Sequence, residues 1–188
     1  NVDSEIKIGL IQSLLIKLFK VKRTTTTNLE LYNSFVRNIS KFSLVTKTDP
    51  VLEASFERVN DSLLFGCLEK PNFEWGRHSV RKLACYNFHS NTVSVSKVFE
   101  NAPDHMLDLL MYHELLHKKL QFEHNGGRYS YHSPKFKRLE NMYPQKKEVD
   151  KEINAHIKSF LQKEKIEKVV QKLPITRKLS LFGFFKKK

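Results

Sequence analysis

Apolar side chains recur at helical spacing in the first third of the chain, and this pattern predicts three helices. The first covers residues 4–19, where isoleucine and leucine recur among lysines. The second begins at a polar cap and runs over residues 27–41. The third is capped near Asp49, has Pro50 in its first turn, and continues to about Leu63.

The pattern then changes to short segments rich in aromatic and β-branched residues, which predicts strands. They cover residues 73–78, 82–88 and 92–96, with turn residues between them. We therefore expect a small sheet of three antiparallel strands. A breaker at residues 101–104 follows, and the helical period returns in a long helix to about Gln121.

The last third of the chain is predicted as a loop and two more helices. Residues 122–131 contain two glycines and are expected to form the loop. A serine and a proline at positions 133–134 form a cap and a first-turn residue, which predicts a helix over 135–142. A charged helix follows from 146 to about 171.

Length and composition favour one compact domain with extensions, because 188 residues with 40% hydrophobic content can bury a single core. We divide the chain into an N-terminal helical extension (1–48), a core (49–145), and a basic C-terminal helix and tail (146–188). No run of eighteen apolar residues occurs, so no transmembrane segment is predicted. The two cysteines indicate buried thiols in a cytoplasmic protein.

Charge is concentrated at the two ends of the chain. The net charge is +13, of which residues 151–188 carry +8 and residues 1–50 carry +4, whereas residues 51–150 carry only +1. This distribution predicts a nearly neutral core with basic flanks that bind DNA without sequence preference. The alternative is that the basic helices are only solvated faces.

The long helix contains the pattern His113-Glu114-Leu-Leu-His117. Residues four apart lie one turn above each other, so the two imidazoles can approach one metal ion from the same side. Glu114 lies beside them, where a carboxylate can act as general base on a water molecule. The apolar residues around the motif predict a buried setting, in which unpaired polar groups are costly. The sequence therefore predicts one zinc ion per chain.

A catalytic zinc needs a third protein ligand, and three downstream residues are candidates. Glu123 has the spacing of the third ligand in metzincins, but Leu120 occupies the position where those proteins have glycine. His124 adjoins the glycine loop and could equally bind substrate. His132 is preferred because the cap that follows it holds it at a helix start.

These residues resemble the SprT-like (Spartan-type) zinc metalloproteases, whose third ligand begins a similar His-Gly/Ser-x-x-Phe segment, here His132-Ser-Pro-Lys-Phe136. Upstream segments within residues 64–96 also resemble the sheet that precedes the active-site helix of that family. The resemblance covers roughly residues 55–142. The cysteine-rich zinc subdomain that many SprT-type proteins carry after the core has no counterpart here.

The resemblance implies an α+β, minigluzincin-like core, in which a small three-stranded antiparallel sheet packs on the HExxH helix. It implies peptide hydrolysis, with a protein substrate extended along the edge strand near the zinc. Three residues are candidate stabilisers of the transition state: His124, Tyr129 and Tyr131.

The C-terminal tail resembles a sliding-clamp-binding peptide in two registers. The bacterial register resembles Gln-Leu-Ser-Leu-Phe and the PCNA-type register resembles Gln-x-x-Leu-x-x-Phe-Phe, with lysine in place of glutamine in both. The residues concerned are Lys178, Leu179, Leu181, Phe182, Phe184 and Phe185. The alternatives are a tail folded onto the body and a weak membrane-surface anchor.

Together these features predict a cytoplasmic, nucleoid-associated zinc endopeptidase that degrades proteins on DNA or crosslinked to it. One alternative is a zinc hydrolase of another bond, such as a phosphoester. The other is a DNA- or clamp-binding adaptor whose metal site is only structural, although such a site would have no use for Glu114 as a base.

Overall fold

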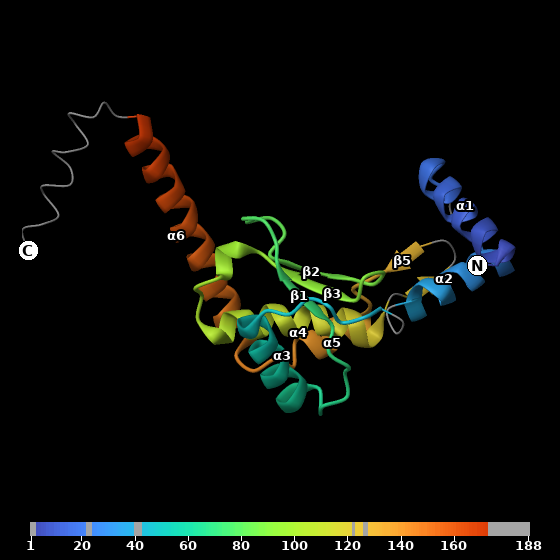
Figure 1. The fold of residues 1–188 in the computed structure, drawn as a ribbon, viewed down its shortest axis with the longest axis horizontal. Helices are drawn as coiled ribbons and strands as arrows, with labels where there is room; N and C mark the ends of the chain where they lie inside the picture. The colour runs from blue at the N-terminus through green and yellow to red at the C-terminus, as the bar shows by residue number, and fades with distance from the viewer. Residues whose placement is uncertain (1–2, 22–23, 40–42, 122, 126–127, 173–188) are drawn as a thin grey trace, which may run out of the picture.

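The computed structural model describes residues 3–21, 24–39, 43–121, 123–125 and 128–172 (Figure 1). The elements follow one another as α1 (Ser4–Leu18), α2 (Thr27–Ile39), α3 (Pro50–Leu63), β1 (Asn72–Trp75), β2 (Ala84–Asn87), β3 (Thr92–Val95), the 3-10 helix η2 (Lys97–Phe99), α4 (Asp104–Leu120), β4 (Glu123–Asn125), β5 (Arg128–Ser130), α5 (Pro134–Glu140) and α6 (Lys146–Lys172). The fold is α+β, as predicted.

Helix starts follow the capping residues. The Asp49 side chain accepts hydrogen bonds from the backbone N–H groups of Val51 and Leu52, and Pro50 occupies the first turn of α3. Ser133 caps α5 in the same way, with its hydroxyl accepting from the backbone N–H of Phe136. Both helices therefore begin where the sequence predicts.

The three-stranded sheet is mixed, so the predicted all-antiparallel sheet is wrong. Its strand order is β1-β3-β2, with β1 parallel to β3 and β2 antiparallel to β3. Residues 76–83 pass across the end of β3, and Ser96 holds them there. Its hydroxyl donates to the carbonyls of Arg77 and Ser79, and its backbone N–H donates to Leu83. This crossing places β3 between its two neighbours and leaves β2 at the edge.

The predicted loop over residues 122–131 is in part a second small sheet. β4 and β5 pair antiparallel, with Glu123 opposite Ser130 and Asn125 opposite Arg128. Only two residues, both glycine, separate the strands in the sequence, and a two-residue Gly-Gly connection is a hairpin signal. The glycines therefore indicated a hairpin and not an irregular loop.

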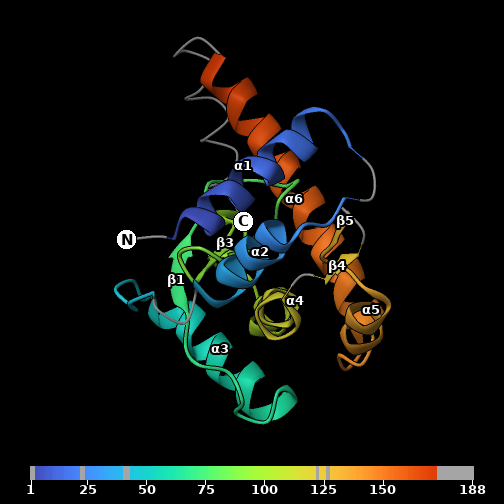
Figure 2. The same ribbon diagram turned by 90° about the vertical axis from the view of Figure 1, so that its right-hand side faces the viewer.

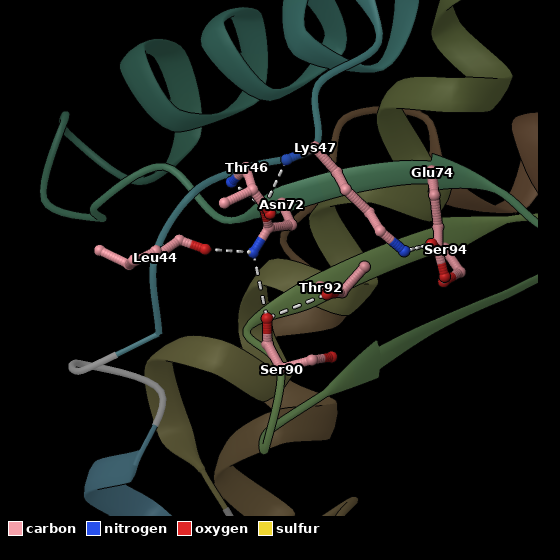
Figure 3. Close-up of polar contacts among 8 residues, drawn as sticks. All are labelled: Leu44, Thr46, Lys47, Asn72, Glu74, Ser90, Thr92 and Ser94. Atoms are coloured by element: carbon pink, nitrogen blue, oxygen red, sulfur yellow. Dashed lines mark hydrogen bonds and ion pairs between the residues drawn. The ribbon is translucent and has the colours of Figure 1, made fainter.

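One buried asparagine ties the segment before α3 to the sheet (Figure 3). The Asn72 side chain accepts hydrogen bonds from the backbone N–H groups of Thr46 and Lys47, at 2.7 and 2.8 Å. Its amide nitrogen donates to the carbonyls of Leu44 and Ser90, both at 3.1 Å. Residues 44–47 therefore lie against the end of β1 and the β2–β3 turn.

Helix α4 lies at the centre of the molecule and carries most of the core. It contacts β2 and β3 on one side and α3, α5 and α6 on others, which Figure 2 shows in a view nearly along its axis. Fully buried residues of α4 include Met111, Leu115 and Leu116. An ion pair joins α3 to α4, with Arg58 donating two hydrogen bonds to Asp108.

The two ends of the chain project from this core in different directions. α1 and α2 pack on each other at one end of the molecule, and α6 extends from the opposite end (Figure 1). The first half of α6 belongs to the core through Val149 and Ile153. Among the helices that the structure describes, none is long and apolar enough to cross a membrane.

Candidate metal centre

Helix α4 presents His113, Glu114 and His117 at the end nearest its C-terminus. His113 and His117 are one turn apart, and their Nε2 atoms lie 3.3 Å from each other. His132 lies outside α4, immediately before α5, and its Nε2 is also 3.3 Å from the Nε2 of His113. Three imidazoles, two from α4 and one from the connection before α5, therefore converge on one point.

Their spacing fits a tetrahedral metal ion. Two nitrogens bound to zinc at 2.0–2.1 Å with a tetrahedral angle are about 3.3 Å apart. The ligand atoms of all three histidines lie within 4.8 Å of one another. Three histidines would leave one of four coordination positions to water or substrate, as in catalytic zinc sites.

A phenylalanine forms the apolar floor under the three rings. Phe136, in the first turn of α5, is fully buried. The centroid of its ring lies 5.1 Å from that of His113, 4.6 Å from that of His117 and 4.8 Å from that of His132. The ring therefore packs against all three imidazoles.

Glu140, at the C-terminal end of α5, holds the first histidine. Its Oε1 lies 2.7 Å from the Nδ1 of His113, which directs the Nε2 lone pair of that ring toward the other histidines. This contact is the main reason why the pKa of Glu140 lies below its usual range. The backbone of the same helix is anchored to α4, because the Tyr112 hydroxyl donates to the carbonyl of Leu139.

Glu114 is buried beside the edge strand β2. It is 4% exposed, and burial raises its pKa to about 7, although the charge of His113, the backbone N–H of Tyr86 and the charge of Lys82 all act in the opposite direction. A carboxylate of this kind can take up and release a proton near neutral pH.

The other two histidines are held in the neutral form that metal binding requires. Burial, followed by the charges of His113 and His132, lowers the pKa of His117 to about 4. Burial and the charge of His113 also lower the pKa of His132. Protons therefore compete weakly with a metal ion at both rings.

Two solved structures are similar to this chain. One is the metallopeptidase zymogen jannalysin of Methanocaldococcus jannaschii, with 28% sequence identity, coverage of 61% of this chain and 99% of that chain, and a TM-score of 0.42. The other is the metallopeptidase zymogen abylysin of Pyrococcus abyssi, with 26% identity, coverage of 59% and 95%, and a TM-score of 0.40. No family model and no curated protein matches the chain.

The three histidines and Glu114 open onto a cleft of about 730 Å³. One wall is β2 with the residues on either side of it, from Lys82 to His89. The opposite wall comes from the N-terminal helices and includes Ser13 of α1 and Tyr32 of α2. The edge strand β2 therefore forms one side of the cleft.

Of the three candidate transition-state stabilisers, the structure describes the side chain of Tyr131 but not those of His124 and Tyr129. Tyr131 lines the cleft, with its ring 6.5 Å from that of Phe88. His124 and Tyr129 face each other in the β4–β5 pair, but their side chains lie outside what the structure describes. The clamp-like peptide in the tail, residues 178–185, also lies outside the described residues.

Sequence reasoning missed Glu140. A signal was present, because Glu140 follows Phe136 by four residues on a helix and therefore shares its face. A residue that shares a face with Phe136 points toward the three histidines.

Proposed function

We propose that this protein is a zinc-dependent endopeptidase. The observation that carries the proposal is the convergence of the three Nε2 atoms at tetrahedral spacing beside the buried Glu114, on a cleft with an open edge strand. His113, His117 and His132 would hold one zinc ion per chain. The bound ion would supply a Lewis acid that polarises the substrate carbonyl and makes water acidic.

The residues of the chain carry the proton transfers. Glu114 takes a proton from the attacking water as the water oxygen bonds to the peptide carbonyl carbon. It then gives that proton to the peptide nitrogen as the C–N bond breaks, so that water is consumed and one acid and one amine are released. A pKa near 7 suits both halves of this cycle.

The substrate would bind as an added strand. β2 is an edge strand of its sheet, and Lys82 and residues 84–89 line the cleft. An extended peptide can therefore form main-chain hydrogen bonds with β2, which gives affinity with little demand on sequence.

The decisive experiment compares Glu114→Gln with wild type and with Glu57→Gln, an exposed glutamate on α3, on casein with and without a chelator. Glu114→Gln should keep its zinc and lose at least about 100-fold of the hydrolysis rate, because an amide cannot accept the proton. Glu57→Gln should match wild type. If wild type cleaves no protein but opens a phosphoester, the peptidase proposal fails. If it binds zinc and hydrolyses nothing, the site is structural.

The finer assignment, a SprT-like enzyme that acts on DNA-associated proteins, is supported by charge. Residues 161–188 contain nine basic and two acidic residues, and Lys163, Lys165 and Lys168 are exposed on the projecting half of α6. Truncation after Phe160 leaves the buried half of α6 in place. This truncation should weaken DNA binding and make the DNA affinity less dependent on salt concentration. DNA affinity that is independent of salt would remove DNA from the account.

A further inference from the structure

Helix α1 exposes its apolar face to solvent and buries small and polar residues. Its buried residues are Gly9 and Ser13, a small residue and a polar one. Most of its large apolar side chains face solvent, over roughly half of the helix circumference, whereas Ile6 and Ile16 are half-buried. These exposed residues are Ile8, Leu10, Ile11, Leu14, Leu15 and Leu18, followed by Phe19 and Val21. An ordinary surface helix has the opposite arrangement.

The packing of α1 on α2 fixes this orientation. A Cβ atom added to Gly9 would lie 2.0 Å from the carbonyl oxygen of Asn28 and 2.6 Å from the Cβ of Tyr32, so the backbones approach too closely for any side chain. Gly9 and Ser13 are four residues apart, which is the spacing of small residues in close helix pairs. Rotating α1 to bury its leucines would place them where only glycine fits. The apolar face therefore stays outside.

A face of this kind is larger than the isolated apolar residues that surfaces ordinarily carry. Leu18 is 73% exposed and Phe19 is 69% exposed, and a groove lined by Ile11, Leu14 and Leu18 runs along the helix. Contiguous apolar surface on this scale marks an interaction site. The helix has 15 residues, a length of about 22 Å, which is shorter than the roughly 30 Å hydrocarbon layer of a bilayer. The face is suited to lying on a membrane and not to crossing it.

The positions of the lysines on α1 indicate what kind of partner the apolar face binds. Lys7 lies within the apolar face, Lys17 borders it and Lys20 follows the helix, whereas the acidic residues Asp3 and Glu5 are confined to its first turn. Two copies of α1 packed face to face would bury Lys7, which lies within the apolar face, away from water. DNA phosphates would pair with the lysines but would leave the leucines exposed to water. An anionic lipid surface can interact with both kinds of residue. Its acyl chains contact the leucines, and the lysine side chains extend along the apolar surface to place their amines at phosphate groups.

We propose that α1 docks the protein onto an anionic membrane surface. The helix would lie in the plane of the interface, with its leucines among the acyl chains and its lysines at the headgroups. α1 also contributes Ser13 to the wall of the cleft, from the side opposite its apolar face, so docking would leave that side of the helix uncovered. This inference concerns where the protein works and does not depend on the proposed reaction.

The test measures co-sedimentation of the full chain with vesicles. One set contains phosphatidylglycerol and phosphatidylcholine in equal amounts, and the other contains phosphatidylcholine alone. The perturbation is Leu14→Gln with Leu18→Gln. The matched control is Ile166→Gln with Val169→Gln, which removes two equally exposed apolar side chains from α6. Wild type and control should bind the anionic vesicles, and the α1 variant should bind them at least about tenfold more weakly.

Zinc content and sedimentation velocity of each variant report on folding and association. Equal binding by the α1 variant and the control would overturn the proposal, and so would equal binding to both vesicle types. If wild type binds neither vesicle type and forms a dimer that the α1 variant abolishes, the face belongs to a second copy of the chain and the membrane proposal is wrong.

Discussion

Removal of the Glu140 carboxylate should weaken metal binding without unfolding the protein. Glu140 accepts from the Nδ1 of His113 at 2.7 Å, and the two side chains are 22% and 30% exposed, so solvent screens the contact only in part. Carboxylates that orient a metal-bound imidazole contribute about 10- to 100-fold to metal affinity, or about 1.4 to 2.7 kcal/mol. We expect this range here.

Two substitutions separate orientation from charge. Glu140→Gln keeps an oxygen that can accept from Nδ1 and removes the charge, so zinc should bind about tenfold more weakly. Glu140→Ala removes both, and its zinc affinity should fall by about 100-fold. Hydrolysis at saturating zinc should decrease less than zinc affinity does, because the ligands themselves remain.

The structure provides a matched control. His105 and Glu152 form a contact of the same kind at 2.6 Å, between α4 and α6 and away from the cleft, with both side chains about half exposed. Glu152→Gln should therefore leave zinc affinity unchanged. Competition with a chromophoric chelator measures the affinity, and circular dichroism confirms the fold. If Glu140→Ala binds zinc as tightly as Glu152→Gln does, Glu140 has no positioning role.

Three further predictions concern the metal ligands and the tail. Elemental analysis should find zinc lost in His132→Ala and retained in His124→Ala, and the reverse result would overturn the choice of third ligand. In metal-free protein, the pKa of His117 is lowered from 6.5 to about 4, so between these pH values the unfolded chain binds a proton at this residue and the folded chain does not. The free energy of unfolding should therefore fall by up to about 3 kcal/mol as the pH drops from 6.5 to 4. His117→Gln should reduce this dependence of stability on pH. A peptide of residues 174–188 should bind a sliding clamp with a micromolar Kd, and titration calorimetry that detects no heat with either clamp type would exclude this role.

The sequence predicted the helices and the three histidines that come together, because each depends on local chemistry. The spacing of His113 and His117 matches one helical turn, and the Ser133 cap fixes the start of α5 next to His132. In these cases a few adjacent residues determine the geometry, and no knowledge of distant contacts is needed.

The direction of the strands could not be predicted in this way. Alternation of apolar residues shows that a strand exists but does not show which strand lies beside it. The order β1-β3-β2 depends on Ser96, whose hydrogen bonds hold residues 76–83 across the end of β3. Those contacts join residues about twenty positions apart and have no local signature.

The same distinction explains α1, where the local pattern predicts a helix but not which of its faces is buried. Counting apolar residues would place the leucines inside, since burial of each stabilises the folded state. The close approach of Gly9 to Asn28 determines the opposite orientation, because a Cβ atom at that position would lie 2.0 Å from the Asn28 carbonyl oxygen and no side chain fits there. Glycine and serine at a four-residue spacing are the only trace of that contact in the sequence. An apolar helix that carries such a pair on its polar side is therefore evidence of a binding surface, even though the same helix, taken by itself, would be assigned to the core.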